Sequence, residues 1–197
     1  SHDWSFVYKI DRTTAPAEVG GPVATSSKVE CAEEATAPTV LPVVKDVCGN
    51  VLEAPTPVVG GTYTDCEGTK TYTYTYKDCS GLEYVWTYTY TIEREDFTMP
   101  ENSGKTVSCE ALAVEPTAPK VTDNCGNDIT PSAASVGGTY DGCEGTKTYT
   151  YTYKDCAGNT HDWVYTYTIE REDFTMPANS GTTVACPTEA VAPTAPK

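Results

Sequence analysis

The segment from Cys66 to Cys79 reads Cys-Glu-Gly-Thr-Lys-Thr-Tyr-Thr-Tyr-Thr-Tyr-Lys-Asp-Cys, and it recurs unchanged from Cys143 to Cys156. Tyrosine and threonine alternate through the second half of both copies. Side chains of a strand point to opposite faces with period two, so one face is aromatic and the other carries hydroxyl groups. Both residue types favour strands. The sequence therefore predicts, twice, a β-strand with a cysteine near each end.

The order of residues recurs along most of the chain with a period of 77 residues. Gly60-Gly61 recurs as Gly137-Gly138, and Trp86 recurs as Trp163. A fixed period of this length indicates one small domain per period. The cysteines keep this spacing, apart from a first interval of 78 residues: Cys31, Cys48, Cys66 and Cys79 recur as Cys109, Cys125, Cys143 and Cys156, and Cys109 recurs as Cys186.

The two ends of the chain match parts of the same repeat. Residues 1–10 match residues 160–169, and residues 175–197 match the start of a repeat. We interpret the chain as part of a longer tandem array. Four segments are predicted: the last strand of a preceding repeat at 1–10, a first repeat at 11–92, a second repeat at 93–169 and the start of a following repeat at 170–197.

Nine cysteines in 197 residues indicate disulfides. A zinc site needs closely spaced cysteines, and the nearest cysteines here, such as Cys66 and Cys79, are thirteen positions apart. Small domains in oxidising compartments use disulfides to supplement a small core. We therefore expect an extracellular, cell-surface protein. The odd cysteine, Cys186, is expected to pair with a cysteine outside the chain, and a free thiol is the alternative.

The formal net charge of −15 argues against a nucleic-acid partner, because phosphate binding needs clustered lysine and arginine. No run of 18 apolar residues is present, so no membrane insertion is expected. The acidic surface suits a soluble extracellular protein.

Short alternating segments between turn signals predict an all-β sandwich, because no sustained helical period is present. The Tyr/Thr strand and the last strand of each repeat should form a hairpin across a short Gly-bearing loop. Gly137-Gly138 should form a bend or bulge. In the second repeat, the expected strands are 105–111, 119–122, weak strands between 128 and 136, and then 146–154 and 162–169.

The tyrosine-rich faces have two interpretations. They fill the core between two sheets, or they form an exposed platform on which sugars stack. The scarcity of Leu, Ile and Phe favours the core interpretation, because few other large apolar side chains are available. The threonine face would then be exposed to solvent.

Two motifs of the second repeat resemble HYR and HYR-like repeats. They are Val-Thr-Asp-Asn-Cys-Gly at 121–126 and Thr-Tyr-Thr-Tyr-Lys-Asp-Cys-Ala-Gly-Asn at 150–159. The version with four cysteines per repeat is found in surface proteins of Bacteroidota. The resemblance implies tandem immunoglobulin-like β-sandwich repeats with two disulfides per repeat, in extracellular adhesins without enzymatic activity. The first repeat departs from the pattern, because Ser80-Gly81-Leu82 replaces Ala-Gly-Asn.

The implied topology suggests which cysteines pair. In such a sandwich the first and third cysteines of a repeat lie at one end, and the second and fourth lie at the other. Sequence alone allows three connectivities among four cysteines. The pairing that this topology implies is Cys31–Cys66 and Cys48–Cys79 in the first repeat, and Cys109–Cys143 and Cys125–Cys156 in the second.

The segment between the repeats, residues 92–100, contains neither Gly nor Ser, so it is not a flexible tether. Phe97 and Met99 are expected to pack against the neighbouring repeat and to give a semi-rigid rod. Calcium is a further hypothesis, because its ligands are oxygen atoms, whereas the alternative is a solvated joint without any cofactor. The carboxylates considered for calcium are Glu93, Glu95, Asp96, Asp123 and Asp128.

No catalytic group of residues is recognised, and we expect a protein that is not an enzyme. The two histidines, His2 and His161, occupy matching positions, and neither has an evident nucleophile nearby. The sequence favours a structural or adhesive stalk or filament segment of a large secreted surface protein. Its expected partners are neighbouring repeats of the same chain, with surface glycans or proteins of a host or another cell as ligands. The alternatives are a carbohydrate-binding module of a secreted enzyme and a strand-swapped subunit of an extracellular polymer.

Overall fold

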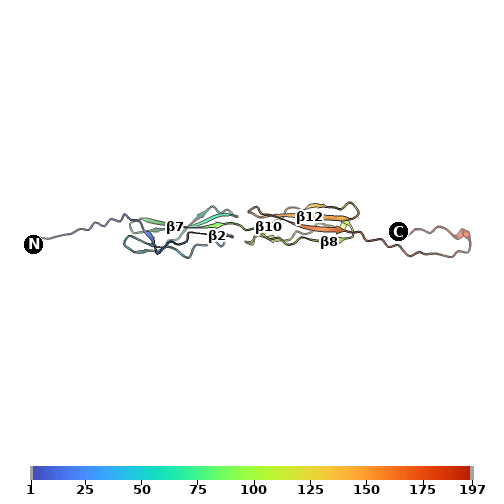
Figure 1. Cartoon of the computed structure of the whole chain (residues 1–197), viewed down its shortest axis with the longest axis horizontal. Helices are drawn as coiled ribbons and strands as arrows, with labels where there is room; N and C mark the ends of the chain where they lie inside the picture. The colour runs from blue at the N-terminus through green and yellow to red at the C-terminus, as the bar shows by residue number, and fades with distance from the viewer. Residues whose placement is uncertain (1, 196–197) are drawn as a thin grey trace. The chain divides into compact units, whose positions relative to one another are not determined.

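The computed structural model describes residues 2–195, and their regular structure consists of β-strands and two one-turn 3-10 helices (Figure 1). The residues divide into two compact units. Within the described residues, the first contains 2–101, 118–133 and 151–163, and the second contains 102–117, 134–150 and 164–195. The first unit thus holds the whole first repeat together with two segments of the second repeat.

The first repeat is built from two sheets. The larger one has the order β2-β7-β6-β5, and the smaller one has the order β1-β3-β4. The first strand of the larger sheet, β2, runs parallel to the last strand, β7, while β6 pairs with β7 as an antiparallel hairpin. The strands are β1 (Ala17–Val19), β2 (Ser26–Val29), β3 (Val43–Lys45), β4 (Val51–Leu52), β5 (Val58–Gly61), β6 (Gly68–Lys77) and β7 (Glu83–Ile92).

The core of this repeat lies on the aromatic face of the β6–β7 hairpin. Its register places Tyr74 opposite Trp86, which are 3% and 4% exposed. Tyr72 and Tyr76 are also buried on this face, and Val44 from the smaller sheet belongs to the same cluster. The opposite face carries paired threonines, such as Thr73 and Thr87, whose hydroxyl oxygens are 3.1 Å apart. The core interpretation of the tyrosines is therefore confirmed.

The second repeat has the same design. Its larger sheet has the order β11-β12-β13-β8, with β8 parallel to β13, and a two-stranded sheet pairs β9 with β10. The elements are β8 (Ser103–Val107), the 3-10 helix η1 (Glu110–Leu112), β9 (Val121–Thr122), β10 (Asp128–Ile129), β11 (Ser135–Gly138), β12 (Gly145–Lys154) and β13 (Thr160–Ile169). The predicted fold class, tandem immunoglobulin-like β-sandwich repeats, is confirmed.

Two glycines allow the close approach of neighbouring strands. Gly61 ends β5 with a φ of 125°, and a Cβ atom there would lie 2.0 Å from the carbonyl oxygen of Thr69. Gly138 ends β11 with a similar φ of 121°, and a Cβ atom added there would lie 2.1 Å from the carbonyl oxygen of Thr146. L-residues with a side chain rarely adopt this conformation. The double glycines therefore end the edge strands, and Gly137-Gly138, where a bend or bulge was predicted, pairs with β12 in regular register up to the end of β11.

The terminal segments differ from the repeats. Residues 2–10 form no strand, and their large apolar side chains are exposed, although a last strand was expected there. The matching strand, β13, is held between β12 and β8, whereas no described strand pairs with residues 2–10. Residues 170–195 contain only the 3-10 helix η2 (Pro187–Glu189), which matches η1.

Candidate functional site

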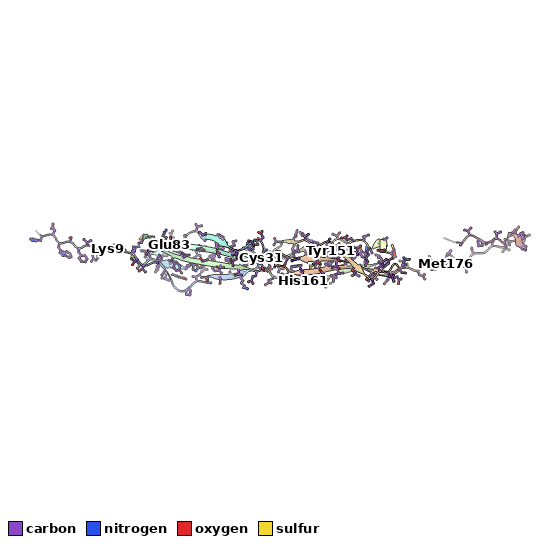
Figure 2. The ribbon with its side chains drawn as sticks, turned by 90° about the horizontal axis from the view of Figure 1, so that it is seen from above. Lys9, Cys31, Glu83, Tyr151, His161 and Met176 are labelled. Carbon is purple, nitrogen blue, oxygen red and sulfur yellow. A yellow bond between two sulfur atoms is a disulfide. The ribbon has the colours of Figure 1, made fainter. Side chains whose placement is uncertain are left out.

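Two disulfides connect the first repeat to the second. Cys31 is bonded to Cys125 and Cys66 to Cys156, with Cα atoms 5.6 and 5.7 Å apart. All four residues belong to the first compact unit. We call this region, with the residues around the two disulfides, the junction. The side chains are drawn as sticks in Figure 2, where Cys31 is labelled.

The predicted pairing within repeats is therefore wrong, as is the expectation of two disulfides inside each repeat. The structure forms none of the predicted bonds Cys31–Cys66, Cys48–Cys79, Cys109–Cys143 and Cys125–Cys156.

The ends of the sandwich were nevertheless assigned correctly in the first repeat. Val29 and Gly68 both pair with Ile92, so Cys31 and Cys66 lie at the same end of the sheet. These two cysteines bond to turns of the next repeat, and not to each other, because those turns bring Cys125 and Cys156 within bonding distance.

The turn that carries Cys125 is held by the carboxylate of Asp123. Its Oδ1 accepts hydrogen bonds from the backbone N–H groups of Cys125 and Asn127, at 2.9 and 2.8 Å, and its Oδ2 accepts one from the Asn127 side chain at 2.9 Å. Gly126 supplies the left-handed residue of the turn, with a φ of 83°. An aspartate that bonds the backbone a few residues ahead is typical of tight turns.

The turn that carries Cys156 is built in the same way around Asp155. Its Oδ1 accepts hydrogen bonds from the N–H groups of Gly158 and Asn159, and the Asn159 side chain donates to Oδ2. In the first repeat, Asp78 holds the matching turn although Leu82 replaces the asparagine, because the backbone N–H of Leu82 still donates at 2.9 Å. The turn therefore depends on the aspartate and the backbone, with the asparagine side chain as an addition.

An ion pair lies in the junction beside the disulfides. Nη1 of Arg94 is 3.5 Å from Oδ2 of Asp123, and the two side chains are 6% and 9% exposed. Burial by itself would raise the pKa of Asp123, but the hydrogen bonds from Asn127 and the charge of Arg94 outweigh it, so this pKa is lowered. The Asp123 carboxylate thus holds its own turn and binds an arginine of the preceding linker.

A second set of contacts fixes the linker between the repeats. Phe97 is 3% exposed, and its ring stands nearly perpendicular to the His161 ring, with the two centroids 4.9 Å apart. His161 Nε2 lies 2.9 Å from the carboxylate of Asp96, and Asn124 Nδ2 donates to the Asp96 carbonyl at 3.3 Å. The expected packing of Phe97 is confirmed, and Met99 is half-buried. His161 contacts the Asp96 carboxylate and the Phe97 ring, so its side chain helps to hold the linker in place.

The carboxylates considered for calcium are not gathered into one site. Four of them contact basic side chains or the turn backbone, and no group of three such ligands occurs among the described residues. Glu95 is exposed. The individual partners are Lys28 for Glu93, His161 for Asp96, Arg94 for Asp123 and Lys120 for Asp128.

The cysteines outside the junction are exposed and form no disulfide within the described residues; they are Cys48, Cys79, Cys109, Cys143 and Cys186. Cys48 lies in the turn after β3, and Cys79 lies in the turn after β6. Arg12 contacts both turns, because its Nη1 is 3.3 Å from Asp46 Oδ2 and 2.7 Å from Cys79 Sγ. Cys109 and Cys143 belong to the second repeat.

Sequence reasoning missed the arginine of the junction. Arginine stands two positions after each of the matching isoleucines Ile10, Ile92 and Ile169, as Arg12, Arg94 and Arg171. The available signal for a charge pair between repeats was that both partners recur: the arginine after each of these isoleucines, and the aspartate of the later turn, as Asp46 and Asp123.

A comparison with known families agrees with this architecture. The family described as "HYR-like domain with 4 cysteines" matches residues 20–92 and 97–169. The chain belongs to this family. The HYR-like chain is also similar to hyalin of Strongylocentrotus purpuratus, with 34% identity over 130 residues, or 61% of the chain. The chain spans about a tenth of the length of that curated relative. Within the described residues, no helix has the length and apolarity needed to cross a membrane.

Proposed function

We propose that this chain is a structural or adhesive segment of a large secreted cell-surface protein, in which repeats are joined in series as a stalk or filament. The observation that carries the proposal is the junction, where two disulfides and one buried ion pair connect consecutive repeats. Disulfides of this kind persist in oxidising compartments, which supports an extracellular location.

The proposed action is mechanical and involves no reaction. Each disulfide closes a large covalent loop between two repeats, and Phe97 of the linker packs against His161 of the second repeat, so bending at the junction would disturb these contacts. A semi-rigid rod formed in this way would hold a distal part of the protein away from the cell. Neighbouring repeats of the same chain are the proposed partners, and a bacterial surface protein of the Bacteroidota type is the proposed setting.

Bending at the junction can be measured directly. Two fluorophores, one on each repeat, should give a single narrow distance distribution in the oxidised chain. The variant Cys125→Ser/Cys156→Ser should give a broader distribution, and Cys186→Ser, which removes an exposed thiol outside the junction, should leave the distribution unchanged. An equally broad distribution for all three proteins would refute the rod.

A second candidate function is carbohydrate binding by the first repeat. A groove of about 530 Å³ is lined by the half-buried rings of Tyr88 and Tyr90 together with Pro22, Val23, Pro38 and Val40. Aromatic rings in a shallow groove are suited to stacking on sugars. Binding on a glycan array that is lost in Tyr88→Ala would favour this candidate, whereas an array without signal would leave the structural role as the better account.

A further inference from the structure

The groove beside Tyr88 and Tyr90 is a feature of the first repeat that the junction does not use. It has a volume of about 530 Å³ and lies between residues 22–24, residues 38–40 and the two tyrosine rings, whose centroids are 4.9 Å apart. None of the residues that line it carries a charge, although the chain has a formal net charge of −15. The groove therefore suits an uncharged occupant.

The matching tyrosine of the second repeat is covered by a side chain of its own repeat. Tyr167 is the counterpart of Tyr90 and is 3% exposed, and Nζ of Lys105 lies 5.4 Å from the centroid of its ring. Lys105 is the residue that pairs with Tyr167, whereas the residue that pairs with Tyr90 is Ser27. A serine is too short to cover the ring, so Tyr90 stays half-buried and open to the groove.

One wall of the groove comes from a segment that is longer in the first repeat. The chain is four residues longer between Ile10 and Cys31 than between Ile92 and Cys109, and the longer stretch includes Gly20-Gly21. Both glycines have positive φ angles, 93° and 103°, and they lead directly into residues 22–24. The wall therefore depends on a turn that the second repeat does not contain.

This wall also leaves one buried polar group without a partner. In the second repeat, Nε1 of Trp163 donates to the carbonyl of Glu101 at 3.0 Å. In the first repeat, Nε1 of the matching Trp86 is buried, and no acceptor for it lies within the described residues. An unpaired buried donor costs free energy. Departures of this kind from the most stable arrangement are expected at functional sites.

The groove is not the surface on which a preceding repeat would lie. In the second repeat, the contacts with the preceding repeat are made by the turns of Cys125 and Cys156, which correspond to the turns of Cys48 and Cys79 in the first repeat. Both tyrosines of the groove lie in the second half of β7, away from the Cys79 turn that comes before this strand. The groove is thus separate from the surfaces that join repeats in series.

The polar groups of the groove suit a peptide. The Tyr72 hydroxyl donates to a backbone carbonyl of its own repeat at 2.7 Å, whereas the hydroxyl groups of Tyr88 and Tyr90 have no hydrogen-bond partner within the described residues. They can donate to the carbonyl groups of a peptide while their rings pack on it. Aromatic grooves bind proline-rich segments in this way, because such segments are already extended. A sugar would bury many more hydroxyl groups than the two phenols and Thr39 can bond.

A segment with this chemistry is present on the surface of the same repeat. The sequence Ala54-Pro55-Thr56-Pro57 lies between β4 and β5 and carries no charge, and among the described residues no backbone hydrogen bond involves residues 54–56. Its two prolines fix their own φ angles and favour an extended backbone at the residues before them. In the second repeat the position of Pro55 is occupied by Ser132, whose N–H donates to the carbonyl of Thr152 at 2.9 Å.

We propose that the groove of one copy of this chain binds the Ala54–Pro57 segment of a second copy, so that neighbouring stalks contact each other laterally. Both halves of the contact belong to the first repeat, and both are replaced in the second. Because the groove and the segment are different surfaces, the contact is heterologous and can continue from copy to copy. It goes beyond the proposed function, which concerns repeats within one chain.

The first test measures the binding of a labelled peptide with residues 53–60, Glu-Ala-Pro-Thr-Pro-Val-Val-Gly. It is added to the full oxidised chain after the exposed thiols have been alkylated, and fluorescence anisotropy should show saturable binding. A peptide with both prolines replaced by alanine should bind at least about tenfold more weakly. Tyr90→Phe, which keeps the ring and removes one hydroxyl, should weaken binding by a smaller factor.

A pair of valines provides the matched variants. Val40→Asp places a charge at the rim of the groove, where the side chain is 68% exposed, and should weaken binding by at least about tenfold. Val85→Asp introduces the same charge on the threonine face of the β6–β7 hairpin, where the side chain is 55% exposed, and should bind the peptide as the parent does. Equal midpoints of thermal unfolding show that both variants are folded.

The second test measures the association of whole chains by sedimentation. The parent should form reversible dimers and larger species at high concentration, and added salt should not dissociate them, because the contact contains no charges. Pro55→Ala/Pro57→Ala keeps the groove, and Val40→Asp keeps the segment. Each variant alone should be a monomer, and a mixture of the two should form a heterodimer.

Equal binding of the two peptides, equal binding by the parent and Val40→Asp, or a mixture that stays monomeric would overturn the inference. A neutral glycan that occupies the groove in place of the peptide would also overturn it, and would support the second candidate function. The stiffness of the junction is measured separately, by the distance between the two fluorophores. The lateral contact can therefore fail while the proposed function stands, and the reverse is also possible.

Discussion

Arg94 and Asp123 form an ion pair between the linker and a turn of the second repeat, with both side chains almost fully buried. Breaking a buried pair is costly because it leaves one charge without its partner. We expect Arg94→Gln to lower the free energy of unfolding by about 3 kcal/mol, measured by urea denaturation.

A matched control for this pair is Lys28–Glu93, whose side chains are 73% and 54% exposed. Lys28→Gln should cost at most about 1 kcal/mol, since exposed pairs contribute little. The double variant Arg94→Gln/Asp123→Asn should lose less stability than the sum of the two single changes. Additive losses would show that the pair is not coupled.

The two disulfides should contribute a large share of the stability. Cys31 and Cys125 are separated by 94 positions in the sequence, and Cys66 and Cys156 by 90. On the chain-entropy account, a loop of this size contributes about 4 to 5 kcal/mol. Cys31→Ala/Cys125→Ala should therefore lower the midpoint of thermal unfolding strongly, whereas Cys186→Ala should not change it. Equal melting curves for the two variants would contradict the assigned pairing.

Stability should fall in acid because two turn carboxylates have lowered pKa values. Hydrogen bonds from Asn50 lower the pKa of Asp46, and the pKa of Asp123 is lowered despite burial, both from an ordinary value of 3.8. A carboxylate with a lowered folded pKa stabilises the fold above its unfolded pKa and loses this effect as the pH falls through its folded pKa. Urea midpoints should therefore drop below about pH 4.

The contribution of Asp123 to this acid sensitivity can be separated. Asp123→Asn should be less stable than the parent near neutral pH, because the charge that faces Arg94 is removed. It should also show a shallower loss of stability in acid, because one titrating group is gone. Parallel pH profiles for the two proteins would mean that Asp123 does not contribute.

The double-glycine ends of the edge strands should not tolerate a side chain. Gly61→Ala places a Cβ atom 2.0 Å from the Thr69 carbonyl oxygen in a backbone conformation unfavourable to alanine. We expect a loss of about 1 to 3 kcal/mol, measured by thermal or urea unfolding. Gly181→Ala is the control, since no atom lies within 4 Å of its added Cβ atom. A neutral Gly61→Ala would contradict the observed strand geometry.

The fold followed from the sequence because its signals are local. Alternation of Tyr and Thr sets the faces of β6 and β12, and the Asp-containing turns set the ends of the strands. The disulfide partners did not follow, because cysteines at one end of a sandwich can bond to each other or to the next repeat. That choice depends on where Cys125 lies relative to Cys31, which is tertiary information. The pairing of Arg94 with Asp123 was missed for the same reason.

The position of β6 between Cys66 and Cys79 affects how the chain would carry a pulling force. Ten of the residues between these cysteines are already in an extended strand, and an extended chain cannot be drawn out further. Cys66 is bonded to Cys156, which stands at the end of the matching strand β12. A pull on the two ends of the chain therefore crosses from the first repeat to the second through the disulfides of the junction, and the β6–β7 hairpin, which lies between Cys66 and Cys125 in the chain, is bypassed.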